Sequence, residues 1–135
     1  YEMHARYVEM DTILRESDFL SIHANLNNES KYMINESKLK RMKNSAYLIN
    51  TSRGQLVDEK GLIKALKNKW IAGGALDVFE SEPLKANSPL IRMENVVLLP
   101  HIGSATYQVR SRMSEIAAQN IIEILQGRKT PYVVN

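Results

Sequence analysis

Apolar residues of this chain gather in four short runs, which are separated by longer stretches that mix apolar and polar residues. Each run is nearly continuous in apolar character, and the runs occupy residues 18–23, 46–50, 72–79 and 95–100. Strands of this composition are typical of a parallel sheet that is covered on both faces. We therefore predict four parallel strands that are buried on both sides.

Helices are predicted at residues 10–17, 35–43 and 57–69, before and between these runs. Asp11 and Asp58 lie where a side chain caps the first turn of the first and the third helix. Strand and helix alternate along the chain, which is the pattern of βαβ units with right-handed crossovers. The predicted fold class is therefore α/β, with a doubly wound parallel sheet.

The last predicted helix is the longest and the most regular. Thr106 is placed to cap its start, and Gly127 and Pro131 are typical of the end of a helix. Its apolar residues recur at helical spacing, at Val109, Met113, Ile116, Ala117, Ile121, Ile124 and Leu125. The following tail, 127–135, is apolar at its end, so we expect it to dock on another surface.

Composition and charge narrow the class of protein. The chain has 135 residues, which suits one domain or part of one, and it is 44% hydrophobic and 24% charged, as in globular proteins. The net charge of +3 is spread along the chain apart from a short basic run at 38–43. Such a run on a helix is typical of a solvated face, so no nucleic-acid partner is predicted.

Several kinds of site are absent from the sequence. The chain contains no cysteine, and its histidines at positions 4, 23 and 101 lack the spacing of metal ligands. No apolar stretch approaches the roughly 20 residues of a membrane span, and no signal peptide is visible. We therefore predict no metal, no membrane association and a cytoplasmic location.

Polar residues follow each of the four predicted strands. The carboxyl ends of parallel strands lie at one edge of a sheet, where ligands bind in doubly wound folds. The residues at these ends are His23 to Asn25, the segment "NTSRG" at 50–54, Asp77 with Glu82, and the segment "PHIGSAT" at 100–106. Their convergence on one edge indicates a functional site.

Each of these residues also has a structural explanation when it is taken alone. Arg53 beside Gly54 and Glu82 before Pro83 are typical of turns, and His23 suits a wall of the fold. Taken together they suit redox chemistry on a small 2-oxo or 2-hydroxy acid. Arginine binds a carboxylate with two parallel hydrogen bonds, and histidine exchanges the proton that accompanies hydride transfer. In this interpretation Glu82 orients His101 and Asp77 faces a cofactor.

Three segments of the chain carry a resemblance to a known family. The segments "INTSRGQLVDEKGLIKAL", "AGGALDVFESEP" and "NVVLLPHIGSAT" closely resemble signature segments of the D-isomer-specific 2-hydroxyacid dehydrogenases. The similarity runs through essentially the whole chain, in order and at the family's spacing. It is therefore far more specific than any one short motif.

The resemblance implies a role for each residue at the predicted edge. It implies that Arg53 holds the substrate carboxylate, that Glu82 supports the histidine, and that His101 is the acid or base. It further implies that NAD or NADP is bound near His23, Asn25, Thr51, Ser52, Arg53, Asp77, His101 and Gly103. The implied fold is the C-terminal half of a Rossmann-like dinucleotide-binding domain, with a final helix and tail.

Two departures from the family pattern change what is expected. Asn25 stands where the family commonly has proline, and Asn27 where it has threonine, so the loop after the first strand differs. No G-x-G-x-x-G segment occurs in the chain. We therefore expect a partial domain over residues 1–126, with the tail at 127–135 returning to an absent substrate domain. A homodimer, or association with a missing N-terminal portion, is expected to cover the exposed edge strand.

The resemblance thus implies an oxidoreductase that transfers a hydride between NAD or NADP and a small 2-oxo or 2-hydroxy acid. A glyoxylate or hydroxypyruvate reductase is favoured, and a D-3-phosphoglycerate dehydrogenase is the next candidate. The alternative is a non-catalytic module, derived from this family, that senses a dinucleotide or mediates dimerisation.

Overall fold

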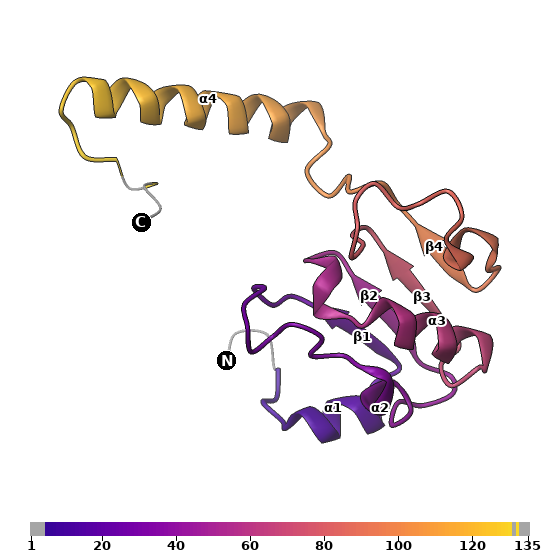
Figure 1. Cartoon of the computed structure of the whole chain (residues 1–135). Coiled ribbons are helices and arrows are strands. Elements are labelled where there is room, and N and C mark those ends of the chain that lie inside the picture. The colour runs from indigo at the N-terminus through magenta and orange to yellow at the C-terminus, as the bar shows by residue number, and fades with distance from the viewer. Residues whose placement is uncertain (1–4, 131, 133–135) are drawn as a thin grey trace. The chain divides into compact units, whose positions relative to one another are not determined.

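The computed structural model describes residues 5–130 and 132. The chain divides into two compact units, Tyr1–His101 and Ile102–Asn135 (Figure 1). His4 and most of the apolar end of the predicted tail lie outside the described residues. The domain boundaries expected from the sequence stay a prediction.

The first unit is built on a parallel sheet of four strands. The strands are β1 (Phe19–Ile22), β2 (Tyr47–Asn50), β3 (Gly73–Leu76) and β4 (Val96–Leu98), and they lie side by side in that order. All three neighbouring pairs are parallel; Leu48 of β2, for example, lies opposite Leu20 and Gly74. The predicted α/β class with a Rossmann-like parallel sheet is therefore confirmed.

Short helices precede the first strand and connect the others. They are α1 (Met10–Glu16), α2 (Glu36–Leu39), α3 (Glu59–Lys67) and two 3-10 helices, η1 (Gly54–Leu56) and η2 (Pro89–Arg92). The Asp58 carboxylate accepts a hydrogen bond from the Gly61 N–H at 3.2 Å, so the predicted cap of α3 is confirmed. The predicted cap of α1 is wrong. Asp11 already lies inside the first turn, and its carboxylate accepts from Arg15 instead.

One side of the sheet carries the hydrophobic core. Alternate side chains of the strands, such as Leu48 and Leu76, pack against apolar residues of the helices, including Leu39 and Leu62. These side chains are almost completely buried. Burial of each is worth about 1.5–3 kcal/mol, so this layer fixes how the strands and helices meet.

The other side of the sheet is open in the described structure. Phe19, Tyr47 and Val97 are 69%, 44% and 59% exposed, although each belongs to a strand. The rings of Phe19 and Tyr47 stack with their centroids 5.6 Å apart. The prediction that the strands are covered on both faces is therefore wrong for β1, β2 and β4. The single core cluster leaves these side chains uncovered.

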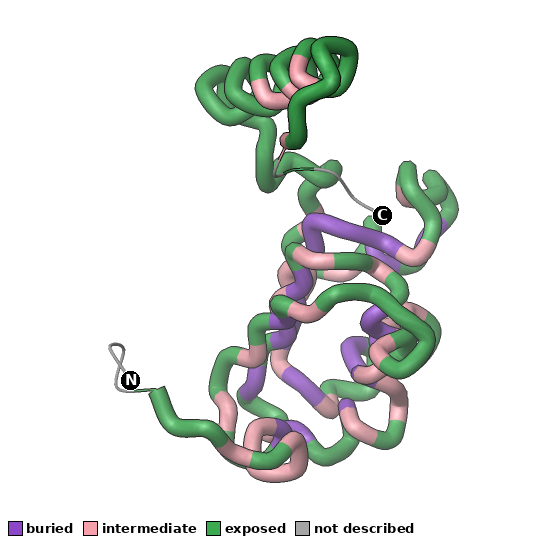
Figure 2. Tube along the Cα trace, turned by 90° about the vertical axis from the view of Figure 1, so that its left-hand side faces the viewer, coloured by how far each residue is buried: buried purple, intermediate pink, exposed green. Residues whose placement is uncertain are grey.

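The second unit is the long helix α4 (Tyr107–Leu125) and the segment that follows it. The Thr106 hydroxyl accepts a hydrogen bond from the Val109 N–H, and Gly127 has a φ of +69°, so both predicted ends are confirmed. None of the residues of α4 is buried (Figure 2). Within the described part of the chain, no helix is both long and apolar enough to cross a bilayer.

Candidate active site

The residues singled out in the sequence follow the strands at the carboxyl edge of the sheet. His23 comes directly after β1, Asn50 is the last residue of β2, and Asp77 comes directly after β3. His101 follows β4 after a short extended segment. Because all four strands are parallel, these positions share one edge of the sheet.

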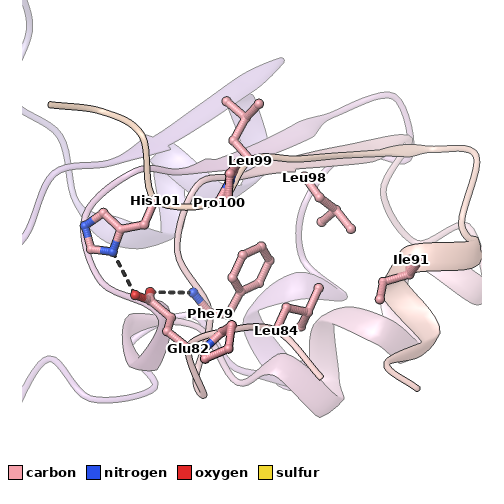
Figure 3. A pocket seen from close by; sticks show the side chains of 9 residues that line it. Phe79, Glu82, Leu84, Ile91, Leu98, Leu99, Pro100 and His101 are labelled. Atoms are coloured by element: carbon pink, nitrogen blue, oxygen red, sulfur yellow. Dashed lines mark hydrogen bonds and ion pairs between the residues drawn. The ribbon is translucent and has the colours of Figure 1, made fainter. Parts of the chain in front are cut away.

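His101 and Glu82 form a close pair at this edge. Nδ1 of His101 lies 2.7 Å from Oε2 of Glu82, and the Phe79 N–H donates to the other carboxylate oxygen at 3.1 Å (Figure 3). An ionised carboxylate only accepts hydrogen bonds, so Nδ1 carries the hydrogen in this pair. Nε2 of His101 is then the ring nitrogen that does not take part in this bond.

The pair also sets the ionisation of the glutamate. The hydrogen bond from His101 lowers the pKa of the Glu82 carboxyl below its usual value, although partial burial acts in the opposite direction. The Phe79 N–H and the charges of His101 and Arg53 lower this pKa further. Glu82 is therefore held as an anion, which is the form that accepts from the imidazole.

The backbone of His101 has an uncommon conformation. Its φ is +54°, in the left-handed region that costs an L-residue about 1–2 kcal/mol. Only a few residue types other than glycine, chiefly Asn, Asp and His, are enriched there. Such conformations persist where the surrounding structure holds them, and they cluster at active sites.

A cavity of about 520 Å³ opens beside the pair. His101 and Glu82 lie at one end of it and Ile91 at the other (Figure 3). The remaining lining is mostly apolar, from Phe79, Pro83, Leu84, Leu98, Leu99 and Pro100. An apolar cavity with a few convergent polar groups is the usual form of a small-molecule site.

A second cleft, of about 480 Å³, lies at the ends of β1 and β2. It brings together four residues predicted to bind a cofactor, namely His23, Asn25, Ser52 and Arg53, with Ala24 and Leu26. The Ser52 hydroxyl donates to the Ile22 carbonyl at 2.7 Å, which ties the two strand ends together. Residues from two separate segments of the sequence therefore line one cleft, whereas their role toward a cofactor stays a prediction.

The turn that presents Arg53 depends on a residue for which the sequence predicted no role. Asn50 is only 1% exposed; its side chain donates to the Arg53 carbonyl at 2.9 Å and accepts from the Ser52 N–H at 3.1 Å. A buried amide satisfied in this way fixes the backbone around it. The signal in the sequence was an amide at the last position of an apolar strand.

Arg53 lies close to the segment that carries Glu82. A Cβ atom added to Gly54 would lie 1.9 Å from the carbonyl carbon and 2.0 Å from the oxygen of Phe79. Only glycine allows two backbones to approach so closely. Gly54 thus brings the segment of Arg53 against the segment of Glu82, and the charge of Arg53 lowers the pKa of Glu82.

The other residues predicted to bind a cofactor, Asp77, Thr51 and Gly103, do not line the second cleft. Asp77 is almost completely buried, and its N–H donates to the Asn50 carbonyl at 3.0 Å, so it adjoins the end of β2. Thr51 is exposed beside Ser52. Gly103 belongs to the second unit and is exposed there.

The second cleft fits part of a dinucleotide by the chemistry of its side chains. The Ser52 hydroxyl and the Asn25 amide suit ribose hydroxyls, and Arg53 supplies positive charge. The glycine-rich loop that holds a pyrophosphate in such folds does not occur in the sequence. Among the described residues, no three acidic or histidine side chains group as metal ligands would.

Comparison with known proteins gives consistent matches. The sequence profile of the "D-isomer specific 2-hydroxyacid dehydrogenase, NAD binding domain" matches residues 1–103. A glyoxylate reductase from Thermofilum pendens is 54% identical over 129 residues, which are 96% of this chain and 38% of that protein. A glyoxylate reductase from Thermococcus litoralis is 53% identical over 134 residues, or 99% of this chain and 40% of that protein.

Solved structures agree with these matches. The TT0316 protein from Thermus thermophilus has a TM-score of 0.89 at 40% identity, over 92% of this chain and 40% of that one. An NAD complex of a D-isomer specific 2-hydroxyacid dehydrogenase from Lactobacillus delbrueckii ssp. bulgaricus has a TM-score of 0.87 at 36% identity, over 98% of this chain and 44% of that one. The chain thus spans about 40% of the length of the curated relatives.

Proposed function

Since this chain belongs to the family of D-isomer specific 2-hydroxyacid dehydrogenases, we propose that it is the part of such an enzyme that carries the catalytic groups. The enzyme would reduce a small 2-oxo acid with NADH or NADPH, and oxidise the 2-hydroxy acid in the reverse direction. The observation that carries this proposal is the hydrogen-bonded pair of His101 and Glu82, with Arg53 beside it.

Arg53 is proposed to bind the carboxylate of the substrate. One N–H of its guanidinium group donates to the Ser52 carbonyl at 2.7 Å, and the side chain is otherwise exposed toward the second cleft. The planar guanidinium group has further N–H donors, which match the two oxygens of a carboxylate. Binding the acid group in this way orients the neighbouring carbonyl toward His101.

His101 is proposed to move the proton. With Nδ1 donating to Glu82, Nε2 of the imidazolium form can donate to the substrate oxygen, and the neutral ring can take the proton back. By accepting this bond, Glu82 holds the ring in one orientation and one tautomer. A bound nicotinamide would supply or accept the hydride.

The cofactor is proposed to be NAD or NADP, held in part by the second cleft. His23, Asn25 and Ser52 line that cleft, and their polar groups suit the ribose and adenosine portions. The other residues assigned to the cofactor are Thr51, Arg53, Asp77, His101 and Gly103. Support comes from relatives solved with NAD and with NADPH.

Among substrates, glyoxylate and hydroxypyruvate are proposed first. Curated relatives at about 50% identity are named glyoxylate reductases. A 3-phosphoglycerate substrate comes second, because a structure described as a putative D-3-phosphoglycerate dehydrogenase, from Ralstonia solanacearum, is 40% identical.

A homodimer and a cytoplasmic location belong to the same proposal. The exposed apolar residues on the open side of the sheet and on α4, such as Phe19 and Leu125, are of the kind that interfaces bury. A cytoplasmic location is proposed because nicotinamide cofactors are available in that compartment. Sedimentation should therefore show association as the protein concentration rises, and a monomer throughout a wide concentration range would remove the dimer from the proposal.

Cofactor binding tests the proposal in the chain itself. NADH and NADPH are titrated by fluorescence against the chain and against Asp77→Asn, which removes a charge and keeps the shape of the side chain. We expect saturable binding that weakens by about tenfold or more in the variant, the cost of one charge-assisted hydrogen bond. Asp18→Asn, at the opposite edge of the sheet, is the matched control and should bind like the unchanged chain.

The outcomes separate the two candidate functions. Absence of binding at millimolar cofactor, or equal binding by Asp77→Asn, would contradict the assigned cofactor site. Turnover is measured after joining the chain to the amino-terminal part of the Thermofilum pendens reductase. Cofactor binding without reduction of glyoxylate, hydroxypyruvate or 3-phosphohydroxypyruvate would favour a non-catalytic dinucleotide-sensing module.

A further inference from the structure

The turn that carries Glu82 is joined to the start of α3 by a second pair of glutamates. The Glu59 N–H donates to Oε1 of Glu80 at 2.8 Å, and the Glu80 N–H donates to Oε2 of Glu59 at 3.3 Å. Glu59 is the first residue of α3, and Glu80 lies two positions before Glu82. The two bonds run in opposite directions, so together they fix the distance and the orientation between the helix and the turn.

Two carboxylates lie side by side here because each accepts a backbone N–H. The first turn of α3 leaves N–H groups without partners inside the helix, and it favours negative charge. Burial raises the pKa of Glu59, and the charge of Glu80 raises it further, whereas the Glu80 N–H and the charge of Lys85 lower it. Burial of a carboxylate costs desolvation free energy, and the two backbone hydrogen bonds offset that cost.

The charge of Glu80 also acts on a third segment of the chain. It raises the pKa of the Tyr32 hydroxyl. The Tyr32 backbone has a φ of +54°, and its N–H donates to the Gln55 carbonyl at 2.8 Å. Glu80 is therefore joined to the start of α3 by hydrogen bonds, and its charge acts on the loop before α2.

The opposite side of the same turn rests on the arginine segment. Gly54 packs against the backbone of Phe79 and Glu80, so closely that a Cβ atom there would lie 2.5 Å from the Glu80 nitrogen. The turn is thus held between Gly54 and Glu59. Within the turn the Phe79 N–H donates to Glu82, whose other carboxylate oxygen is bonded to His101.

From these contacts we propose that Glu80 is a positioning residue for the pair of Glu82 and His101. Held by its two bonds to Glu59, Glu80 keeps the turn at 79–82 in the orientation in which Glu82 accepts from Nδ1 of His101. Glu80 itself does not line the cavity beside His101. The consequence for catalysis rests on the proposed function, whereas the geometry belongs to this chain and is testable without cofactor or substrate.

The tautomer of His101 reports whether Glu80 positions the pair. A histidine ring free in water favours the Nε2–H tautomer, whereas the bond to Glu82 requires hydrogen at Nδ1. The ¹⁵N chemical shifts of the two ring nitrogens, measured above the pH at which the ring loses its charge, give the tautomer ratio. Glu80→Ala is expected to lower the share of Nδ1–H relative to Nε2–H by about fivefold, as for the loss of one hydrogen bond.

Companion variants separate positioning from a general loss of structure. Glu80→Gln keeps an oxygen that accepts from the Glu59 N–H, so it should restore most of the Nδ1–H form. Glu59→Ala removes the carboxylate that accepts from the Glu80 N–H, at a residue that is only partly buried, so the fold is retained and a smaller shift in the same direction is expected. Glu94→Ala removes an exposed glutamate at the amino end of β4 and should leave the ratio unchanged.

The tautomer measurement can support or overturn the role of Glu80 whatever the result of the cofactor titration. A ratio like that of the unchanged chain in folded Glu80→Ala would overturn the proposal, even if the chain binds NADH. If Glu80→Ala does not fold, an unchanged ratio in Glu59→Ala would overturn it. A shifted ratio in Glu80→Ala that Glu80→Gln restores would support it, even if the chain binds no cofactor.

Discussion

Replacing His101 by asparagine is expected to lower the rate of 2-oxo acid reduction by about 10²–10⁴-fold, the usual contribution of a positioned acid or base. The assay uses the chain joined to the amino-terminal part of the Thermofilum pendens reductase, with saturating cofactor. The reason is that Nε2 of His101 is the group left to exchange a proton once Nδ1 is bonded to Glu82. The loss should fall on kcat, and the Kd for NADH should change little.

Asparagine is the replacement of choice because of the backbone at this position. His101 has a φ of +54°, and asparagine adopts the left-handed region more readily than alanine does. Lys69, an exposed residue with a φ of +55°, gives a matched control. Lys69→Asn places an asparagine at another left-handed backbone position, outside the candidate active site, and should leave kcat unchanged. If His101→Asn retained a kcat within about fivefold of the unchanged enzyme, another group would have to be the acid or base.

The elements of the fold were predictable where their causes are local in the sequence. The cap of α3 joins Asp58 to Gly61, and α4 begins with a bond between Thr106 and Val109. Each of these bonds spans three residues, so the residue types along the chain suffice to predict it. The strands were likewise predictable, because an unbroken apolar run identifies a buried strand.

The cover of the sheet was not predictable from the same runs. Phe19 and Val97 continue the apolar pattern of their strands, yet they lie on the open side of the described sheet. An apolar run shows that a strand requires cover on both faces. It does not show which part of the protein supplies the cover, because that depends on contacts between distant elements.

The residues of the candidate site likewise divide into those that the sequence predicted and those that it did not. His101 and Glu82 were predicted as a pair from their residue types and from the resemblance, and the structure places them in contact. Glu59 and Glu80 were not singled out, because a lone glutamate in a charged segment resembles any surface residue. Their role depends on reciprocal bonds between residues 21 positions apart, for which the sequence pattern holds no signal.

Replacing Arg53 by lysine is expected to raise the KM for the 2-oxo acid by about 10–100-fold in the joined enzyme. The substitution keeps the positive charge, but an ammonium group cannot form two parallel hydrogen bonds with a carboxylate. Loss of one such charge-assisted bond costs about 1.5–3 kcal/mol, which corresponds to this change in KM. The KM for NADH should change less, because the ends of β1 and β2 supply other polar groups in that cleft.

The distribution of the effect between KM and kcat then shows what Arg53 does. If the arginine only binds the acid group, kcat at saturating substrate stays near that of the unchanged enzyme. If it also orients the carbonyl toward His101, kcat falls as well, because a small displacement of the reacting atoms is costly. Arg92→Lys makes the same exchange at an exposed residue of the 3-10 helix η2 and should alter neither constant. An unchanged KM in Arg53→Lys would contradict the proposal that Arg53 binds the substrate carboxylate. Another cationic side chain near Glu82 and His101 would then have to bind that carboxylate.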